Sequence, residues 1–248
     1  DPGLAGIRIG LAGFASARAA ETMLGAFDAA TLPNGRKIPV DFVSFHGYSD
    51  DPLDIVDRIE SVATAARATT HYSGVELVLG EWGPDLQANA GNASYAESIE
   101  PALHIATVLS LGAAAGLGRA HHAILFDFYP VIELGILDDQ IRPKPAHRAF
   151  ELLAEVITGD SERLVLTSHP DGRVSDDVSV LASRRGDGTI HMLFTNRGSS
   201  AFVDVDFGGA RFPQTIRRFR DPAGDIEDFG TAGPRVLLPT ESLVLVTL

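Results

Sequence analysis

The first 158 residues alternate between short apolar runs and longer stretches with helical spacing, and this alternation most constrains the fold. Each apolar run is bounded by Gly, Pro or polar residues, which is typical of a buried strand. The four runs are 4–14 (LAGIRIGLAGF), 40–48 (VDFVSFHGY), 75–84 (VELVLGEWGP) and 121–128 (HHAILFDF). The helical stretches that follow them are 17–30, 53–69, 93–115 and 145–157. This order predicts a parallel sheet covered by helices.

Four strand–helix units are half of an eightfold β/α barrel, so the sequence predicts strands five to eight of such a barrel. A four-stranded doubly wound sheet is the alternative. That fold would carry a glycine-rich phosphate loop after a strand, and the sequence has none; Leu11–Phe14 (LAGF) is not such a loop. We therefore expect the half-barrel.

The pattern changes after about Thr158, where short alternating runs replace the helical stretches. Turn sequences separate these runs, among them PDG at 170–172 and GDG at 186–188. Strands at this spacing predict an antiparallel β-sandwich. The runs are 164–166, 178–182, 189–195, 201–207, 215–219 and 242–248. The chain is thus expected to be α/β plus all-β, with a barrel part at 1–158 and an accessory sandwich at 159–248.

The amino-acid composition narrows the classes of partner that the chain could bind. The net charge of −13 argues against nucleic acid and anionic membrane surfaces, whereas neutral polymers such as polysaccharides remain open. No run approaches the eighteen or so apolar residues of a membrane span, so we expect a soluble chain. The absence of Cys excludes disulfides and thiolate metal sites but does not identify a compartment, and a secreted or periplasmic location is compatible with it. The start at Asp1, with neither Met nor a signal pattern, reads as the middle of a longer polypeptide.

Glu81 is the first candidate for a catalytic residue. It ends the third apolar run beside Trp82, the only tryptophan of the chain. Residues at the C-terminal ends of barrel strands face the active site. A carboxylate there can meet the oxocarbenium-like centre that forms when a glycosidic bond breaks. The alternative is a glutamate that caps a strand at the surface.

The four strand ends together resemble the second half of a clan A glycoside hydrolase, most like family 39, the β-xylosidase and α-L-iduronidase relatives. Three segments carry the resemblance: DFVSFHGY at 41–48, LGEW at 79–82 and IRPKPAHRAFELL at 141–153. In that family a KP…AFELL segment follows the eighth strand, and a β-sandwich then packs against the barrel. The resemblance covers residues 4–158 in detail and the remainder by architecture.

The resemblance implies that Glu81 is the nucleophile of a retaining mechanism and that no metal or organic cofactor is needed. His46 and Tyr48 would orient Glu81 or a sugar hydroxyl, and Trp82 would stack on a sugar face. Each has a structural alternative: His46 a packed or surface residue, and Trp82 a filler of the barrel mouth. Further substrate-binding groups are expected from the eighth strand and its loop, namely Asp127, Tyr129 and Glu133. Alternatively, Asp127 is a buried partner of a barrel arginine and Glu133 a solvated loop charge.

The sequence departs from that family in one large respect. The family's general acid/base lies in an Asn-Glu pair at the fourth strand, and this chain contains no Asn-Glu dipeptide. Glu60 and Glu76 fall on a helix and at a strand start, on the wrong side of a barrel. We therefore expect a second polypeptide or segment to supply strands one to four and the acid/base. The alternative is a non-catalytic carbohydrate-binding or scaffold protein.

A metal site is not expected at the histidines. His121 and His122 are adjacent on a predicted strand, and adjacent strand residues point to opposite faces of a sheet. They cannot easily bind one ion together, and His104 belongs to a helical stretch. We therefore predict structural roles for these three side chains.

Overall fold

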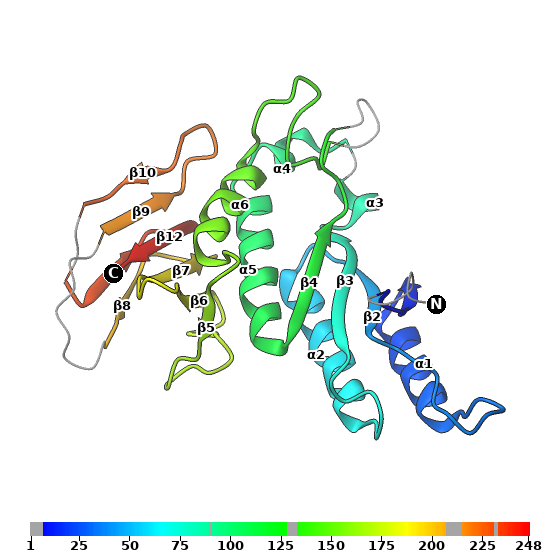
Figure 1. The fold of residues 1–248 in the computed structure, drawn as a ribbon. Coiled ribbons are helices and arrows are strands. Elements are labelled where there is room, and N and C mark those ends of the chain that lie inside the picture. Colours follow the sequence, from blue (N-terminus) through cyan, green and yellow to red (C-terminus); the bar gives the residue numbers. More distant parts are fainter. Residues whose placement is uncertain (1–6, 90, 128–132, 207–214, 231–232) are drawn as a thin grey trace. The chain divides into compact units, whose positions relative to one another are not determined.

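A computed structural model describes residues 7–89, 91–127, 133–206, 215–230 and 233–248 (Figure 1). The chain divides into two compact units. The first is Asp1–Gly83 with Ala115–Ala123, and the second is Pro84–Ala114 with Ile124–Leu248. Each unit is described separately. The domain boundary expected at residue 158 stays a prediction, and it falls in the short connection between a helix and a strand of the second unit.

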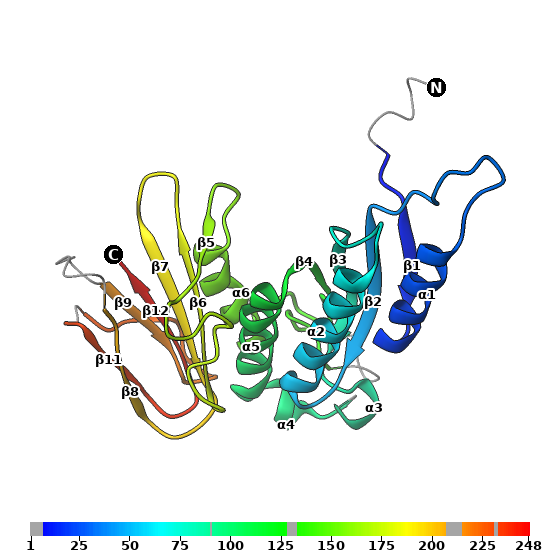
Figure 2. The ribbon, with the colours of Figure 1, turned by 90° about the horizontal axis from the view of Figure 1, so that it is seen from below.

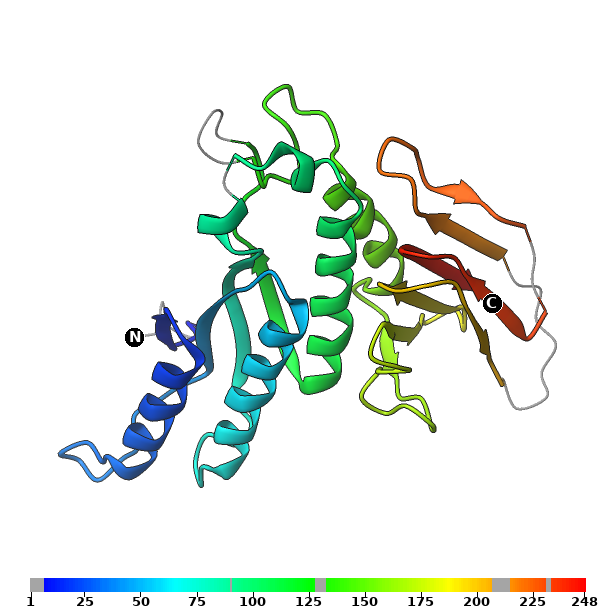
Figure 3. The same cartoon turned by 180° about the vertical axis from the view of Figure 1, so that it is seen from behind.

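The first unit contains a four-stranded parallel sheet in the order β1-β2-β3-β4 (Figures 1 and 3). The strands are β1 (Gly10–Phe14), β2 (Phe42–Tyr48), β3 (Glu76–Gly83) and β4 (Leu117–His122). Helices α1 (Ala17–Ala29) and α2 (Pro52–Ala68) pack on each other along one side of this sheet. The expected parallel sheet covered by helices is confirmed.

The helix-facing side of the sheet is apolar because alternate strand residues point to it. Val43 and Phe45 of β2 are fully buried, and Leu79 of β3 is also fully buried. A Cβ atom on Gly47 would lie 3.0 Å from the Ile55 side chain of α2. Residues 43, 45 and 47 therefore share the face that the helices cover.

The other face of β2 carries half-buried side chains that lie against glycines of the neighbouring strands. A Cβ atom on Gly13 would be only 2.9 Å from His46 Nε2, and one on Gly10 would overlap the Phe42 ring. Side chains of β2 thus use the space that glycines leave on the neighbouring strands. The close pairs are Phe42–Gly10, Ser44–Gly80 and His46–Gly13, whereas Tyr48 and Gly83 are at ordinary contact distance.

Capping residues define where the two helices begin, just beyond the C-terminal ends of β1 and β2. The Ser16 hydroxyl accepts a hydrogen bond from the Ala19 N–H at 3.3 Å. Asp51 does the same for the Leu53 N–H at 2.9 Å, and Pro52 occupies the first turn of α2. Such caps satisfy N–H groups that have no partner within the helix.

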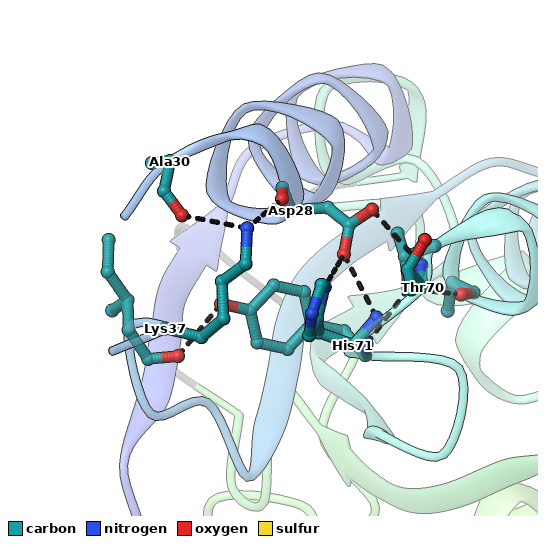
Figure 4. A network of polar contacts seen from close by, with 9 residues as sticks. Asp28, Ala30, Lys37, Thr70 and His71 are labelled. Atoms are coloured by element: carbon teal, nitrogen blue, oxygen red, sulfur yellow. Dashed lines mark hydrogen bonds and ion pairs between the residues drawn. The ribbon is translucent and has the colours of Figure 1, made fainter. Parts of the chain in front are cut away.

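A polar network joins the other ends of the helices, where the strands begin (Figure 4). The Asp28 carboxylate accepts the backbone N–H groups of Thr70 and His71 at 3.0 and 2.9 Å, and it lies 2.9 Å from His71 Nδ1. These hydrogen bonds, that from Thr70 first, lower the pKa of Asp28. Lys37 Nζ donates to the carbonyls of Asp28 and Ala30. The network ties the end of α1 to the loop between α2 and β3.

The second unit combines helices with antiparallel strands. Its helices are α3 (Leu86–Asn89), α4 (Ala93–Ala96), α5 (Glu100–Ala115) and α6 (Pro145–Val156). Six strands form an antiparallel sheet in the order β10-β9-β12-β7-β6-β5, and β11 pairs with β8 (Figure 2). The bounds are β5 (Glu162–Leu164), β6 (Val178–Arg184), β7 (Ile190–Asn196), β8 (Ala201–Asp204), β9 (Thr215–Phe219), β10 (Glu227–Asp228), β11 (Arg235–Leu238) and β12 (Ser242–Thr247).

One apolar cluster joins the two antiparallel sheets of this unit. Val236 and Leu238 of β11 are fully buried in it with side chains from four strands of the larger sheet. Helix α6 also contacts the larger sheet, where Ser183 Oγ donates to the Val156 carbonyl at 2.6 Å and Arg217 pairs with Glu155. The antiparallel part is confirmed, while the complete sandwich topology stays a prediction.

Several predicted boundaries differ from the structure. The fourth strand covers 117–122 instead of 121–128, because Gly116 has a positive φ of 100° and ends α5 so that the strand starts early. The stretch 93–115 is two helices, α4 and α5, separated by Glu97–Ile99. Strand β11 was not predicted, because Pro234 and Pro239 flank a run of only four residues.

Candidate active site

Three of the predicted site residues form one polar cluster at the C-terminal ends of β2 and β3. The Tyr48 hydroxyl donates to Glu81 Oε1. His46 Nδ1 lies 3.5 Å from the other carboxylate oxygen, Oε2. The side chain of Glu81 is 44% exposed and that of His46 is 29% exposed. The cluster is therefore held by neighbouring strands and remains open to solvent on one side.

Tyr48 is a fixed donor to Glu81. Burial raises the pKa of the Tyr48 hydroxyl, and its hydrogen bond to the Glu81 carboxylate raises it further. The hydroxyl therefore stays protonated at any pH at which the protein would work. Arg58 Nη1 of α2 donates to the Tyr48 carbonyl at 3.0 Å and holds the end of β2.

Trp82 is adjacent to Glu81 but points elsewhere. Its side chain is fully buried, and its ring meets His122 of β4 edge-on, with ring centroids 5.2 Å apart and an interplanar angle of 85°. Burial of the ring favours the interpretation in which Trp82 fills the core. His122, considered from the sequence only as a metal ligand, thus lies beside the cluster. A Cβ atom on Gly83 would be 3.8 Å from both His122 and Tyr48.

Asp127 belongs to the second unit, where a buried lysine binds it. Lys144 Nζ donates to both carboxylate oxygens, at 2.9 and 3.1 Å, and the Gly135 N–H donates to one of them at 2.7 Å. Lys144 also donates to the Glu133 carbonyl at 2.7 Å. The Lys144 and Asp127 side chains are only 4% and 10% exposed. This geometry favours the alternative of a buried ion pair for Asp127, with a lysine in place of the expected arginine.

This ion pair explains what the lysine of the Lys144-Pro145 motif does. Lys144 joins Asp127 to the Glu133 carbonyl, and Pro145 begins α6 immediately afterwards. Tyr129 lies outside the described residues. Asp127 and Glu133 lie in a different unit from Glu81, so their part in a common site stays a prediction.

The described residues contain no group of three or more His, Asp or Glu side chains that could hold a metal ion. In the same part of the chain, no helix combines the length and apolar character needed to cross a membrane. Neither finding bears on what the chain binds.

Comparison with known proteins supports the fold. No model of a known protein family matches the sequence, and no curated protein matches it. Solved structures do match. One is the α-L-arabinofuranosidase of Thermotoga maritima, with a TM-score of 0.59, 17% identity, and coverage of 85% of this chain and 53% of the other. A second is the family 51 arabinofuranosidase of Xanthomonas axonopodis pv. citri, with a TM-score of 0.65, 16% identity, and coverage of 95% and 56%.

A third match is the catalytic domain of the family 30 xylanase C of Talaromyces cellulolyticus, with a TM-score of 0.55, 14% identity, and coverage of 85% and 62%. These similar structures are clan A glycoside hydrolases, and they do not single out family 39. The chain spans about half the length of the first structures it matches. At this level of identity the likeness shows the fold: the chain has a glycosidase-like fold whose parallel sheet fits part of a β/α barrel.

Proposed function

We propose that this chain is the nucleophile-bearing half of a retaining glycoside hydrolase. The observation that carries the proposal is the Glu81 carboxylate, held by Tyr48 and facing His46 at the strand ends of a glycosidase-like parallel sheet. The substrate is an oligosaccharide, polysaccharide or simple glycoside. The similar structures include arabinofuranosidases, a xylanase and a family 44 xyloglucanase, which supports a carbohydrate substrate.

The two oxygens of Glu81 have different roles in this mechanism. Oε1 accepts the Tyr48 hydrogen bond, which fixes the plane of the carboxylate. Oε2 has His46 only at 3.5 Å and is the oxygen free to attack the anomeric carbon. The attack forms a glycosyl–Glu81 ester while the leaving oxygen takes a proton from a general acid. A water molecule then attacks the same carbon and gives its proton to the group that was the general acid, while the bond between the sugar and Glu81 breaks and the sugar is released.

We infer that the general acid comes from outside this chain. Retention requires a second carboxyl group about 5–5.5 Å from the nucleophile. Glu76 begins β3, whereas Glu81 lies near its end, and Glu76 is already paired with Arg8 and with Arg119 at 2.9 Å. Glu60 is an exposed residue of α2. We therefore propose that a further polypeptide or segment carries barrel strands one to four together with the acid/base.

The edges of the parallel sheet support this proposal. β1 and β4 are the outer strands of the sheet among the described residues, and exposed parallel edges are rarely left unpaired. Ile7 and Ile9, just before β1, are 60% and 46% exposed. The matched structures are about twice as long as the aligned region. Four further strands, one of them paired with each edge, would close an eightfold barrel.

The first test is the mass of the native protein, followed by the masses of its components under denaturing conditions. A partner of barrel-half size supports the split enzyme. The completed protein is then incubated with a panel of activated 2-fluoro glycosides, which trap the ester, and the labelled peptide is identified by mass spectrometry. We expect Glu81 to be labelled in the wild type and in the Glu60→Gln control. The Glu81→Gln variant should carry no label. A different labelled residue would disprove the assignment.

A non-catalytic carbohydrate-binding or scaffold protein is the second candidate. The observation favouring it is that the sequence contains no Asn-Glu dipeptide at which the acid/base could lie. For such a protein, Glu81→Gln would leave sugar binding almost unchanged, and no turnover would exist to lose. A folded, monomeric 248-residue chain that binds sugar without cleaving it would establish this function.

A further inference from the structure

The pairing of β3 with its neighbours contains one extra residue immediately before Glu81. Leu79 pairs with Phe45 of β2, but the next β2 residue, His46, pairs with Glu81 and not with Gly80. On the other side of β3, Leu79 pairs with Ala120 of β4 and Trp82 pairs with His122. Three residue steps along β3 therefore match two steps along β4. Both ladders therefore place a one-residue bulge at this point of β3, next to the candidate nucleophile.

The bulge decides which face of the sheet carries Glu81. Leu77 and Leu79 pair with Val43 and Phe45, on the face that the helices cover. Strict alternation would continue this series with Glu81 and bury its carboxylate under α2. With Gly80 as the extra residue, Glu81 instead pairs with His46 and reaches the Tyr48 hydroxyl.

A side chain at the bulge would meet Ser44. A Cβ atom on residue 80 would overlap Ser44 Oγ and would lie 3.7 Å from Ser44 Cβ. The obstacle is thus the Ser44 hydroxyl, since the Cβ distance is an ordinary van der Waals contact. Gly80 has no positive φ, so this steric contact and not backbone conformation favours glycine here.

We propose that Gly80 and Ser44 are positioning residues: the bulge at Gly80, seated against Ser44, turns the Glu81 carboxylate onto the face of His46 and Tyr48. Bulges commonly re-aim a side chain beside an active site. This inference deepens the proposed function and rests on it for its catalytic meaning. The geometry itself can be tested without any turnover.

The test uses Tyr48 as a reporter of where the carboxylate lies. The full chain is labelled with ¹³Cζ-tyrosine, and the Tyr48 signal is assigned by its absence from Tyr48→Phe. At about pH 10.5 an ordinary tyrosine is largely ionised. In the wild type Tyr48 is expected to stay neutral, because burial and the Glu81 hydrogen bond raise its pKa. Circular dichroism at the same pH confirms that each variant is folded.

Two variants then decide, with Glu81→Gln as the reference for a Tyr48 without the carboxylate charge. Gly80→Ala is expected to raise the ionised fraction of Tyr48 at this pH toward that of Glu81→Gln, because the added methyl group displaces β3 and the carboxylate with it. Burial of the Tyr48 hydroxyl, the larger cause of its raised pKa, remains in both variants. The double variant Ser44→Ala/Gly80→Ala removes the obstructing oxygen and is expected to restore the neutral signal.

Gly74→Ala is the matched control, since a Cβ atom there would meet nothing within 4 Å. A folded Gly80→Ala protein with an unchanged Tyr48 signal would overturn the proposal. So would a double variant that fails to recover the signal. Absence of glycosidase activity in the completed wild-type protein would instead overturn the proposed function and leave the bulge in place.

Discussion

Glu81 and Asp127 were both expected in the site, and the structure gives them opposite surroundings. Asp127 is 10% exposed, and both of its oxygens accept hydrogen bonds from Lys144. Glu81 is 44% exposed, with one oxygen bound by Tyr48 and the other 3.5 Å from His46. The difference shows how one type of side chain can serve two purposes. A carboxylate whose acceptor capacity is used inside the protein holds a loop, whereas one with an open oxygen can react.

The largest expected effect is on catalytic activity, which should depend on Glu81 and not on Asp127. In the completed protein, Glu81→Gln should reduce kcat by a factor on the order of 10⁴ or more, because no other group forms the ester. Its free energy of unfolding should fall by only about 1 kcal/mol, because the amide oxygen of glutamine still accepts the Tyr48 hydrogen bond, without the charge. Steady-state kinetics and urea unfolding measure the two quantities. Comparable losses of turnover in Asp127→Asn and Glu81→Gln would break the comparison.

The next effect is on stability, which should depend on the ion pair of Asp127 with Lys144. Lys144→Met leaves a buried carboxylate without its cation, which should cost about 3–5 kcal/mol of unfolding free energy. The double variant Asp127→Asn/Lys144→Met should recover part of this loss, because no buried charge remains unpaired. Urea unfolding of the single and double variants forms the cycle. Equal losses in Lys144→Met and the double variant would show that the pair does not hold the loop.

A smaller effect concerns how firmly Glu81 is held. Tyr48→Phe removes one hydrogen bond to a charged group, a contribution of about 1.5–3 kcal/mol. We expect kcat of the completed protein to fall about 10- to 100-fold with little change in KM, because the carboxylate then rotates away from the attack geometry. Tyr72→Phe is the control, since that hydroxyl donates to the Ile38 carbonyl away from Glu81. A change confined to KM would assign Tyr48 to sugar binding.

The smallest effect concerns the pH dependence of stability and a third carboxylate, Asp28. Asp28 lies near the surface, and both of its oxygens accept hydrogen bonds. Thr70 and His71 lower its pKa in the folded state. Its contribution to stability is therefore fully present above the unfolded-state pKa of about 3.9 and is lost as the pH falls through the lower folded value. Asp28→Asn should flatten the dependence of stability on pH in the acid range, as measured by thermal unfolding from about pH 5 to pH 2. An unchanged slope would show that the network in Figure 4 contributes no linkage.

The sequence predicted what depends on local periodicity and on position along a strand. The alternation of apolar and helical runs predicted the parallel sheet. Tyr48 and Glu81, both expected at strand ends, are hydrogen-bonded there, and their roles stay a prediction. Strict alternation with Leu77 and Leu79 would have turned Glu81 toward the helices. The bulge that prevents this depends on a contact between Gly80 and Ser44, which are 36 positions apart and pair only through the register of two strands.

The partner of Asp127, Lys144, was not predicted for a similar reason. Lys144 lies 17 positions away, beyond a loop, and nothing in the local pattern singles it out from other basic residues. A Lys-Pro dipeptide before a helix signals the helix start through its proline, but the destination of the lysine depends on tertiary packing. Local patterns therefore located the elements, and long-range packing assigned the roles of their side chains.

The glycines that face β2 have a consequence for how this part of the sheet tolerates substitution. Because glycines of β1 and β3 lie against Phe42, Ser44 and His46, the space on this face depends on pairs of positions in two strands. A larger residue at position 10, 13 or 80 therefore requires a smaller one at the paired position of β2. Substitutions here must be made in pairs, as in Ser44→Ala/Gly80→Ala.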